Sequence, residues 1–235
     1  SDFFKSPLFD KTYSEREVKA VNNEHQKNKL NDGWRGSFVS KQISEPGHPL
    51  TMFGTGNQDT LSGDNRPALL DFYEKYYSAS NMKLALISNI PMQNLFGIAK
   101  KYFSGIPSRE VNVPSMPKVF RKPLKNKFRL LKVKTIKDIR SLEVDFPTIR
   151  LKDYQDSKPS GIIGSLIGHE GKGSLLSKLK EEGLVLSLSA GGGSSHPDIN
   201  SFGISVSLTP KGLQNYERIL HLIFNYIRMI REHGV

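Results

Sequence analysis

A proline-rich break near the middle of the chain is the feature that most constrains its fold. Four prolines punctuate it: Pro107, Pro114, Pro117 and Pro123. Proline lacks the backbone donor that helices and strands need, so regular structure is not expected to continue through this stretch. The sequence therefore predicts two folded parts, residues 1–117 and 118–235, with a linker over about 107–123.

The first part has mainly helical patterns. A helix is expected from Ser14 to about Asp32, because Ser14 and Glu17 have the spacing of a capping box. Three further elements are expected: a helix over 66–77, a strand from Met82 to Ser88, and an amphipathic helix over 92–103.

The second part mixes both periodicities. Its clearest strand is 201–208, where Phe202, Ile204, Val206 and Leu208 alternate with serine and glycine. Thr209 followed by Pro210 has the residue types that cap and open a helix, so a long helix is expected from there. Other elements are strands over 127–133, 139–146 and 184–189, and helices over 158–169 and 174–182. The fold class expected is α+β, with two consecutive pieces.

Composition narrows the class of protein. Hydrophobic residues make up 37% of the chain without an apolar run of eighteen, so a membrane span is not expected. Cysteine is absent, which excludes disulfides and thiolate metal sites and suits a reducing compartment; the cytoplasm is the favoured location. The chain begins without Met and without a signal-peptide pattern, so we expect it to be a piece of a longer protein.

The positive charge is concentrated in one segment. The net charge is +11, and nine lysines and arginines lie between Lys118 and Lys137 without an acidic residue. Such a stripe can attract nucleic acid or other polyanions. It is equally typical of a solvated linker and of a strand edge guarded by lysine. Because no nucleic-acid-binding motif accompanies it, we favour the second interpretation and expect no specific nucleic-acid partner.

No local motif completes a catalytic site. The six histidines lack HExxH and HxxEH spacing, and P-loop and GxSxG patterns are absent. Glu17 and Glu24 lie seven residues apart, two turns on one helical face, and could contribute to a metal site. A capping box would explain Glu17 without any function, and Glu24 beside Lys27 would equally fit a solvated helix surface.

Several collinear segments resemble the insulinase (pitrilysin) family of zinc metallopeptidases. They are, in order, SPLFD, EREVKAVNNEHQKNKLNDGWR, FGTGN, DFYEKYYSASNMKLALIS, IKDIRSLEVDFP and LIGHEGKGSLLSKLKEEG. The resemblance covers essentially the whole chain and is strongest to the insulin-degrading enzyme branch. It implies that residues 1–117 are the C-terminal part of a first, zinc-binding domain. It implies that residues 118–235 begin a second, inactive-type domain, each domain being a mainly antiparallel sheet packed with helices.

The same resemblance implies roles for the two carboxylates. In the family, two histidines of an HxxEH motif and a later glutamate bind zinc, and the glutamate of that motif is the general base. The later pattern, ExxxxxxE followed by His, corresponds to Glu17, Glu24 and His25. Glu24 would then be the third zinc ligand, Glu17 a carboxylate that orients the site, and His25 a neighbour. HxxEH is missing here, which we interpret as truncation upstream.

The resemblance also implies substrate contacts. Trp34 and Thr55 match positions that line the cleft near the scissile bond, although a single Trp is equally typical of a core. Leu188, Ser189 and Ala190 match an edge strand that pairs with the N-terminus of a peptide, an exosite beside Gly168–Glu170. An ordinary hairpin would explain this strand as well.

The expected function is therefore that of a zinc metalloendopeptidase acting on peptides and small unfolded polypeptides. The chain alone is expected to be inactive and to bind no zinc tightly, and the rest of the polypeptide is an expected partner. A noncatalytic peptide-binding or scaffolding paralogue is the alternative. Because truncation would leave apolar surface or a sheet edge exposed, self-association is also expected.

Overall fold

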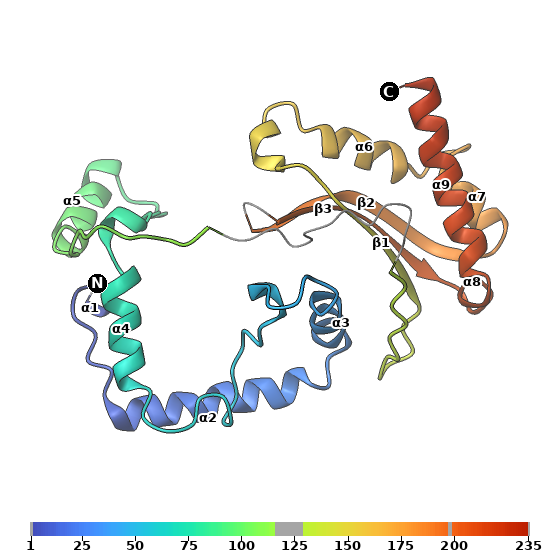
Figure 1. Cartoon of the computed structure of the whole chain (residues 1–235). Helices are drawn as coiled ribbons and strands as arrows, with labels where there is room; N and C mark the ends of the chain where they lie inside the picture. The colour runs from blue at the N-terminus through green and yellow to red at the C-terminus, as the bar shows by residue number, and fades with distance from the viewer. Residues whose placement is uncertain (1, 116–128, 197–198, 235) are drawn as a thin grey trace. The chain divides into compact units, whose positions relative to one another are not determined.

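The chain forms two separate units in a computed structural model, which describes residues 2–115, 129–196 and 199–234 (Figure 1). The first unit spans Ser1–Pro117 and the second Lys118–Val235. The division falls inside the proline-rich stretch, where the four prolines predict a break. The assignment of the units to consecutive family domains stays a prediction, and each unit is described by itself below.

Every secondary-structure element assigned in the first unit's described residues is a helix. Its elements are α1 (Asp2–Lys5), α2 (Lys11–Asn28), α3 (Asp32–Lys41), η1 (Pro49–Thr51), α4 (Arg66–Tyr76), η2 (Ala79–Asn81) and α5 (Met92–Phe103). The helices predicted over 66–77 and 92–103 are thereby confirmed as α4 and α5.

The boundaries of the first long helix differ from the prediction. α2 begins one turn earlier than Ser14, because Asp10 is the N-cap and its carboxylate accepts a hydrogen bond from the backbone N–H of Tyr13 at 3.2 Å. Ser14 therefore lies inside the helix, and the predicted capping box with Glu17 is wrong. The chain then starts a second helix, α3, whose N-cap Asn31 accepts from the N–H of Trp34 at 3.2 Å.

The strand predicted from Met82 to Ser88 does not form. The segment is extended, but it pairs with no other segment, and residues 2–115 contain no β-strand. The sequence pattern describes the preference of the segment itself, whereas a strand also requires a neighbour that supplies hydrogen bonds.

The first unit has a small interior. Tyr73 on α4 is 3% exposed and is the only buried hydrophobic residue among residues 2–115. Its hydroxyl lies within hydrogen-bond distance of the carbonyl oxygens of Phe4 and Lys5, at 3.0 and 2.7 Å, which ties the N-terminal segment to α4. The Arg109 guanidinium lies over the Tyr73 ring, 5.4 Å from its centroid.

The second unit is a helix-covered antiparallel sheet. Its elements are β1 (Ser141–Pro147), η3 (Leu151–Tyr154), α6 (Pro159–Ile167), α7 (Leu175–Glu181), β2 (Val185–His196), β3 (Ile199–Leu208), α8 (Pro210–Gln214) and α9 (Tyr216–His233). The strand order is β1-β3-β2. The α+β class is thereby confirmed.

The strand predicted over 127–133 is absent at residues 129–133, and residues 127 and 128 lie outside the described part.

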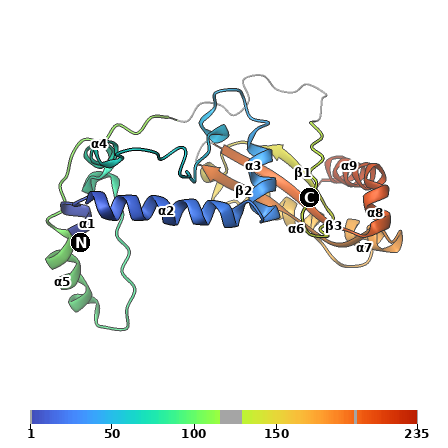
Figure 2. The same cartoon turned by 90° about the horizontal axis from the view of Figure 1, so that it is seen from below.

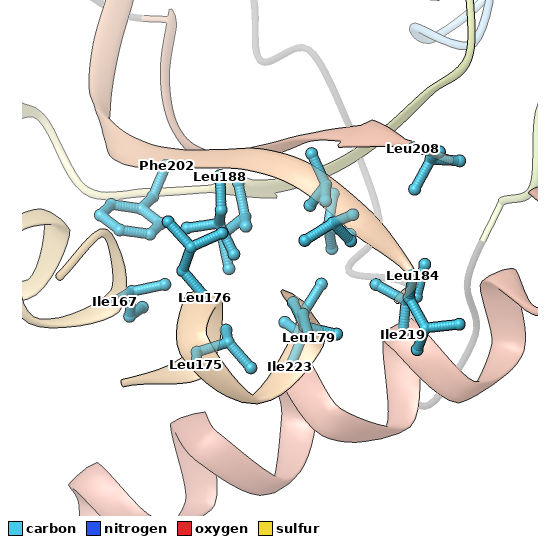
Figure 3. Close-up of a cluster of buried hydrophobic side chains, with 14 residues drawn as sticks. Ile167, Leu175, Leu176, Leu179, Leu184, Leu188, Phe202, Leu208, Ile219 and Ile223 are labelled. Atoms are coloured by element: carbon cyan, nitrogen blue, oxygen red, sulfur yellow. The ribbon is translucent and has the colours of Figure 1, made fainter. Parts of the chain in front are cut away.

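The core of the second unit lies between the sheet and its helices. The register pairs Leu188 with Val206 and Ala190 with Ile204, so these side chains share one face of the sheet. Figure 3 shows leucine and isoleucine side chains from α6, α7 and α9 filling the space against that face. The alternation over 201–208 therefore predicted the inward-facing residues of β3 correctly.

The predicted helix after Thr209 is broken in two. Thr209 caps α8 as expected, because its hydroxyl oxygen accepts from the N–H of Gly212 at 2.9 Å. Asn215 then leaves the helical conformation, and α9 begins at Tyr216. Leu213, predicted on the apolar stripe, is 49% exposed as a result.

An ion pair joins α9 to the end of α7. Two nitrogens of Arg218 lie 2.8 and 3.1 Å from the carboxylate oxygens of Glu182. The hydrogen bonds from this guanidinium hold the pKa of Glu182 below its ordinary value.

Candidate functional site

The two predicted carboxylates lie on α2. Glu17 and Glu24 are both exposed, and their spacing of two turns places them on the same side of this helix. Within the described residues neither carboxylate makes a hydrogen bond or an ion pair. Because Asp10 caps the helix, capping no longer explains Glu17, and both side chains have their oxygens available to a ligand.

A segment after η1 packs on the C-terminal half of α2. The rings of His25 and Phe53 meet edge to face, with centroids 4.8 Å apart. Asn22 accepts a hydrogen bond from the backbone N–H of Gln58 at 3.2 Å. Thr55, which is half-buried, lies between these two contacts along the segment, so the structure carries it beside the part of α2 that holds Glu24.

Trp34 lies in the first turns of α3, on the same unit. Its side chain is 51% exposed, so the core interpretation of this residue is wrong. Single exposed apolar side chains are common on protein surfaces, so exposure alone assigns Trp34 no role. Its role as a substrate contact stays a prediction.

These residues supply only part of a metal site. Among the described residues, no group of three or more histidine or acidic side chains is placed to hold a metal ion. An exposed, unpaired carboxylate such as that of Glu24 suits zinc as one ligand. Three protein ligands are the rule for catalytic zinc, so this chain alone provides an incomplete set.

The predicted exosite strand lies at an edge of the sheet in the second unit. β2 pairs with β3 on one side, and it is an end strand of the described sheet. Leu188 is 6% exposed and points into the core, whereas Ser189 is exposed on the opposite face and Ala190 is half-buried. The three residues therefore offer backbone groups and one small polar side chain to a ligand.

Helix α6 packs directly on the backbone of this strand. A Cβ atom on Gly164 would lie 2.8 Å from the carbonyl oxygen of Ala190 and 3.2 Å from Cα of Gly191. One on Gly168, just after α6, would lie 3.6 Å from the Ala190 nitrogen. The Gly168–Glu170 segment thus borders β2, and His169 Nδ1 accepts from the N–H of Gly171 at 3.1 Å.

A further hollow that the sequence patterns did not indicate lies beside the N-terminal half of α2. It has a volume of about 880 Å³. It is lined by Lys11, Ser14, Glu15, Val18 and Lys19 of α2 and by residues of the 58–65 segment. Glu17, Glu24, Trp34 and Thr55 do not line it, so it is separate from the candidate site.

The basic stripe adds no site to this picture. Its residues up to Lys127 lie outside the described part of the chain. Of the remainder, the Lys132 ammonium lies 5.5 Å from the centroid of the Tyr216 ring, a contact that uses the charge within the second unit.

No helix in the described residues is long and apolar enough to cross a membrane.

Comparison with known proteins shows which family the chain belongs to. The family described as "Peptidase M16 inactive domain" matches residues 65–235. Insulin-degrading enzymes of Drosophila melanogaster and Homo sapiens are each 39% identical over 100% of this chain. A Schizosaccharomyces pombe protein named as a zinc protease is 36% identical over 98% of it. The chain spans about a quarter of these relatives, 24% of each.

Solved structures share the fold. A structure of pitrilysin matches 100% of this chain and 25% of its own, with a TM-score of 0.84 and 32% identity. A peptidase M16 inactive domain from Pseudomonas fluorescens matches 99% of the chain and 54% of its own, with a TM-score of 0.69 and 17% identity. The predicted resemblance is thus confirmed: this chain belongs to the M16 (insulinase, or pitrilysin) peptidase family and carries its inactive-type domain.

Proposed function

We propose that this chain is part of a longer zinc metalloendopeptidase that degrades peptides and small unfolded polypeptides. The observation that carries the proposal is the pair Glu17 and Glu24, exposed and unpaired on one side of α2 within the described residues. The relatives named as insulin-degrading enzymes and as a zinc protease support the same reading.

In this proposal Glu24 is one zinc ligand and Glu17 orients the site. The other ligands and the general base come from a part of the polypeptide outside this chain. Zinc, when bound, supplies a Lewis acid that polarises the substrate carbonyl and a water molecule. Among the residues of this chain, Glu24 supplies a negative charge to the proposed zinc site. Trp34 supplies an apolar surface, and Thr55 supplies a neighbouring polar group.

The edge of β2 is proposed to hold the substrate away from the reacting bond. An extended peptide that adds a strand at Leu188–Ala190 would be bound through its backbone, which suits an enzyme acting on many sequences. The close packing of α6 on Ala190 and Gly191 holds β2 in place for this role. A labelled extended peptide should bind the chain, and the same peptide with N-methylated backbone amides should not.

The decisive experiment uses the longer protein. Glu24→Gln removes the charge of the proposed ligand while keeping its shape, so bound zinc and peptide cleavage should both be lost. Glu15→Gln, the same change on the same helix, is the matched control and should keep both. Glu17→Gln should weaken zinc affinity by about 10- to 100-fold, as loss of an orienting group does.

The outcome that overturns the proposal is a Glu24→Gln protein that keeps full zinc and full activity. The chain of 235 residues by itself should bind no stoichiometric zinc, because its described residues present no group of three ligands.

A noncatalytic role is the second candidate, and one observation favours it: the family that matches residues 65–235 is described as an inactive domain. If the longer protein lacks an intact HxxEH motif, Glu24 has no zinc to bind. Peptide capture at the β2 edge would then remain the function to test.

A further inference from the structure

A buried histidine in the first unit lies where the chain turns back towards the candidate site. His48 is 3% exposed, although most side chains of this unit are open to solvent. The buried residues among 2–115 are Ser44, His48, Tyr73 and Ser78. Buried polar groups are as a rule hydrogen-bonded, so the partners of His48 indicate what it does.

Three hydrogen bonds of the η1 turn converge on His48. Its side-chain Nδ1 accepts from the backbone N–H of Leu50 at 3.1 Å. Its carbonyl oxygen accepts from the backbone N–H of Thr51 at 2.9 Å and from the Thr51 hydroxyl at 2.7 Å. His48 is thus the N-cap of η1, with its ring in the place of the short polar side chains that ordinarily cap helices.

The turn is fixed to α3 on one side. Gln42, the C-cap of α3, donates from its side-chain amide to the carbonyl oxygen of Thr51 at 3.1 Å. After η1 the chain returns along α2 towards α4, as Figure 2 shows.

On its other side the turn leads to the contacts with α2. Phe53 lies against His25, and the backbone N–H of Gln58 donates to Asn22 at 3.2 Å. Thr55 lies between these two contacts along the chain. All of these bonds are made by described residues of the first unit, so none of them needs a part of the longer protein outside this chain.

We propose that His48 is a positioning residue, which places Thr55 beside the part of α2 that holds Glu24. Its ring fixes the start of η1 and therefore the direction in which the chain leaves the turn. Met52 alone separates η1 from Phe53, so a loosened cap would act directly on the contact with α2. The link from Thr55 to catalysis rests on the proposed function, whereas the position of the segment does not.

Two substitutions at His48 test the hydrogen bond to Leu50. His48→Ala removes the acceptor. In His48→Asn the amide oxygen can accept from the same N–H, because asparagine commonly bonds the backbone two residues further on. Neither variant keeps the imidazole ring, so a difference between them reports on the acceptor.

Hydrogen exchange in the longer protein measures the position of the segment without using activity. In His48→Ala the backbone amide of Gln58, well beyond the turn, should exchange about 2- to 30-fold faster, the range that a lost cap gives. His48→Asn should restore slow exchange. His169→Ala is the matched control, because His169 makes the same bond to the N–H two residues on, at 3.1 Å, in the second unit. It should leave the exchange of Gln58 unchanged.

A milder variant serves if His48→Ala does not fold, which far-UV circular dichroism shows. Thr51→Val removes one of the three bonds to His48 and keeps nearly the same shape. It should speed the exchange of Gln58 in the same direction. Exchange of Gln58 that is unchanged in the folded variants overturns the proposal, and so does a His48→Asn protein that exchanges as fast as His48→Ala.

Peptide cleavage by the longer protein then tests the link to the site. His48→Ala should raise KM and keep bound zinc, because Glu24 lies on α2 and not on the displaced segment. His48→Asn should return KM towards that of the unmodified protein. Faster exchange of Gln58 with an unchanged KM would support the positioning of the segment and would count against Thr55 as a substrate contact.

Discussion

At the residue scale, Gly164 is a position where the second unit tolerates little change. A side chain there would meet the backbone of β2, at Ala190 and Gly191, and backbone cannot turn aside as a flexible side chain can. Gly161, on the same helix, would place its Cβ in ordinary contact, 3.8 Å from Cβ of Lys158. The two glycines therefore lie on the same helix, α6, and differ in what surrounds them.

We expect Gly164→Ala to lower the free energy of unfolding of the second unit by about 1–3 kcal/mol, as overpacking does. Gly161→Ala should instead raise it by up to about 1 kcal/mol, because alanine favours the helix. Urea unfolding followed by circular dichroism measures both. Equal effects of the two changes would show that α6 does not press on β2.

At the element scale, the start of α2 distinguishes the structure from the sequence pattern. Asp10 accepts a hydrogen bond from Tyr13, whereas Ser14 lies within the helix and its backbone N–H bonds to the Asp10 carbonyl at 2.9 Å. The capping-box pattern failed because an equally good cap lies one turn upstream. Local spacing alone does not rank two such caps.

Asp10→Ala should destabilise α2 by about 1 kcal/mol, because the first turn loses its side-chain acceptor. Ser14→Ala should be neutral or slightly stabilising, since alanine is the better residue inside a helix. Helix content measured by far-UV circular dichroism should fall in the first variant and not in the second. A loss of helix content in Ser14→Ala and not in Asp10→Ala would instead support the capping box at Ser14.

At the scale of the whole molecule, the two units differ in how much core they have. The second unit buries a continuous cluster of fourteen hydrophobic residues. The first unit buries only Tyr73 among its described hydrophobic residues and leaves several large ones exposed. Burial of apolar surface is the main stabilising contribution, so the first unit should be the less stable of the two.

The single tryptophan makes this testable, because Trp34 lies in the first unit. As the urea concentration rises, the fluorescence of Trp34 should change first. The hydrogen-exchange protection of β3 should be lost only at a higher urea concentration. Coincident transitions would mean that the chain unfolds as one cooperative body.

The sequence by itself determined the break between the units, the α+β class, the positions of α4 and α5, and the inward face of β3. These follow from proline chemistry and from apolar periodicity, which act within a few residues. The shared face of Glu17 and Glu24 followed from helical spacing in the same way, and their family roles remain proposals.

Only the tertiary structure decided the rest. It left Met82–Ser88 unpaired, broke the last helix at Asn215, and exposed Trp34 instead of burying it. Each outcome depends on which distant segments are present to supply hydrogen bonds or apolar contacts. A local pattern states what a segment prefers, and the surrounding chain decides whether that preference is met.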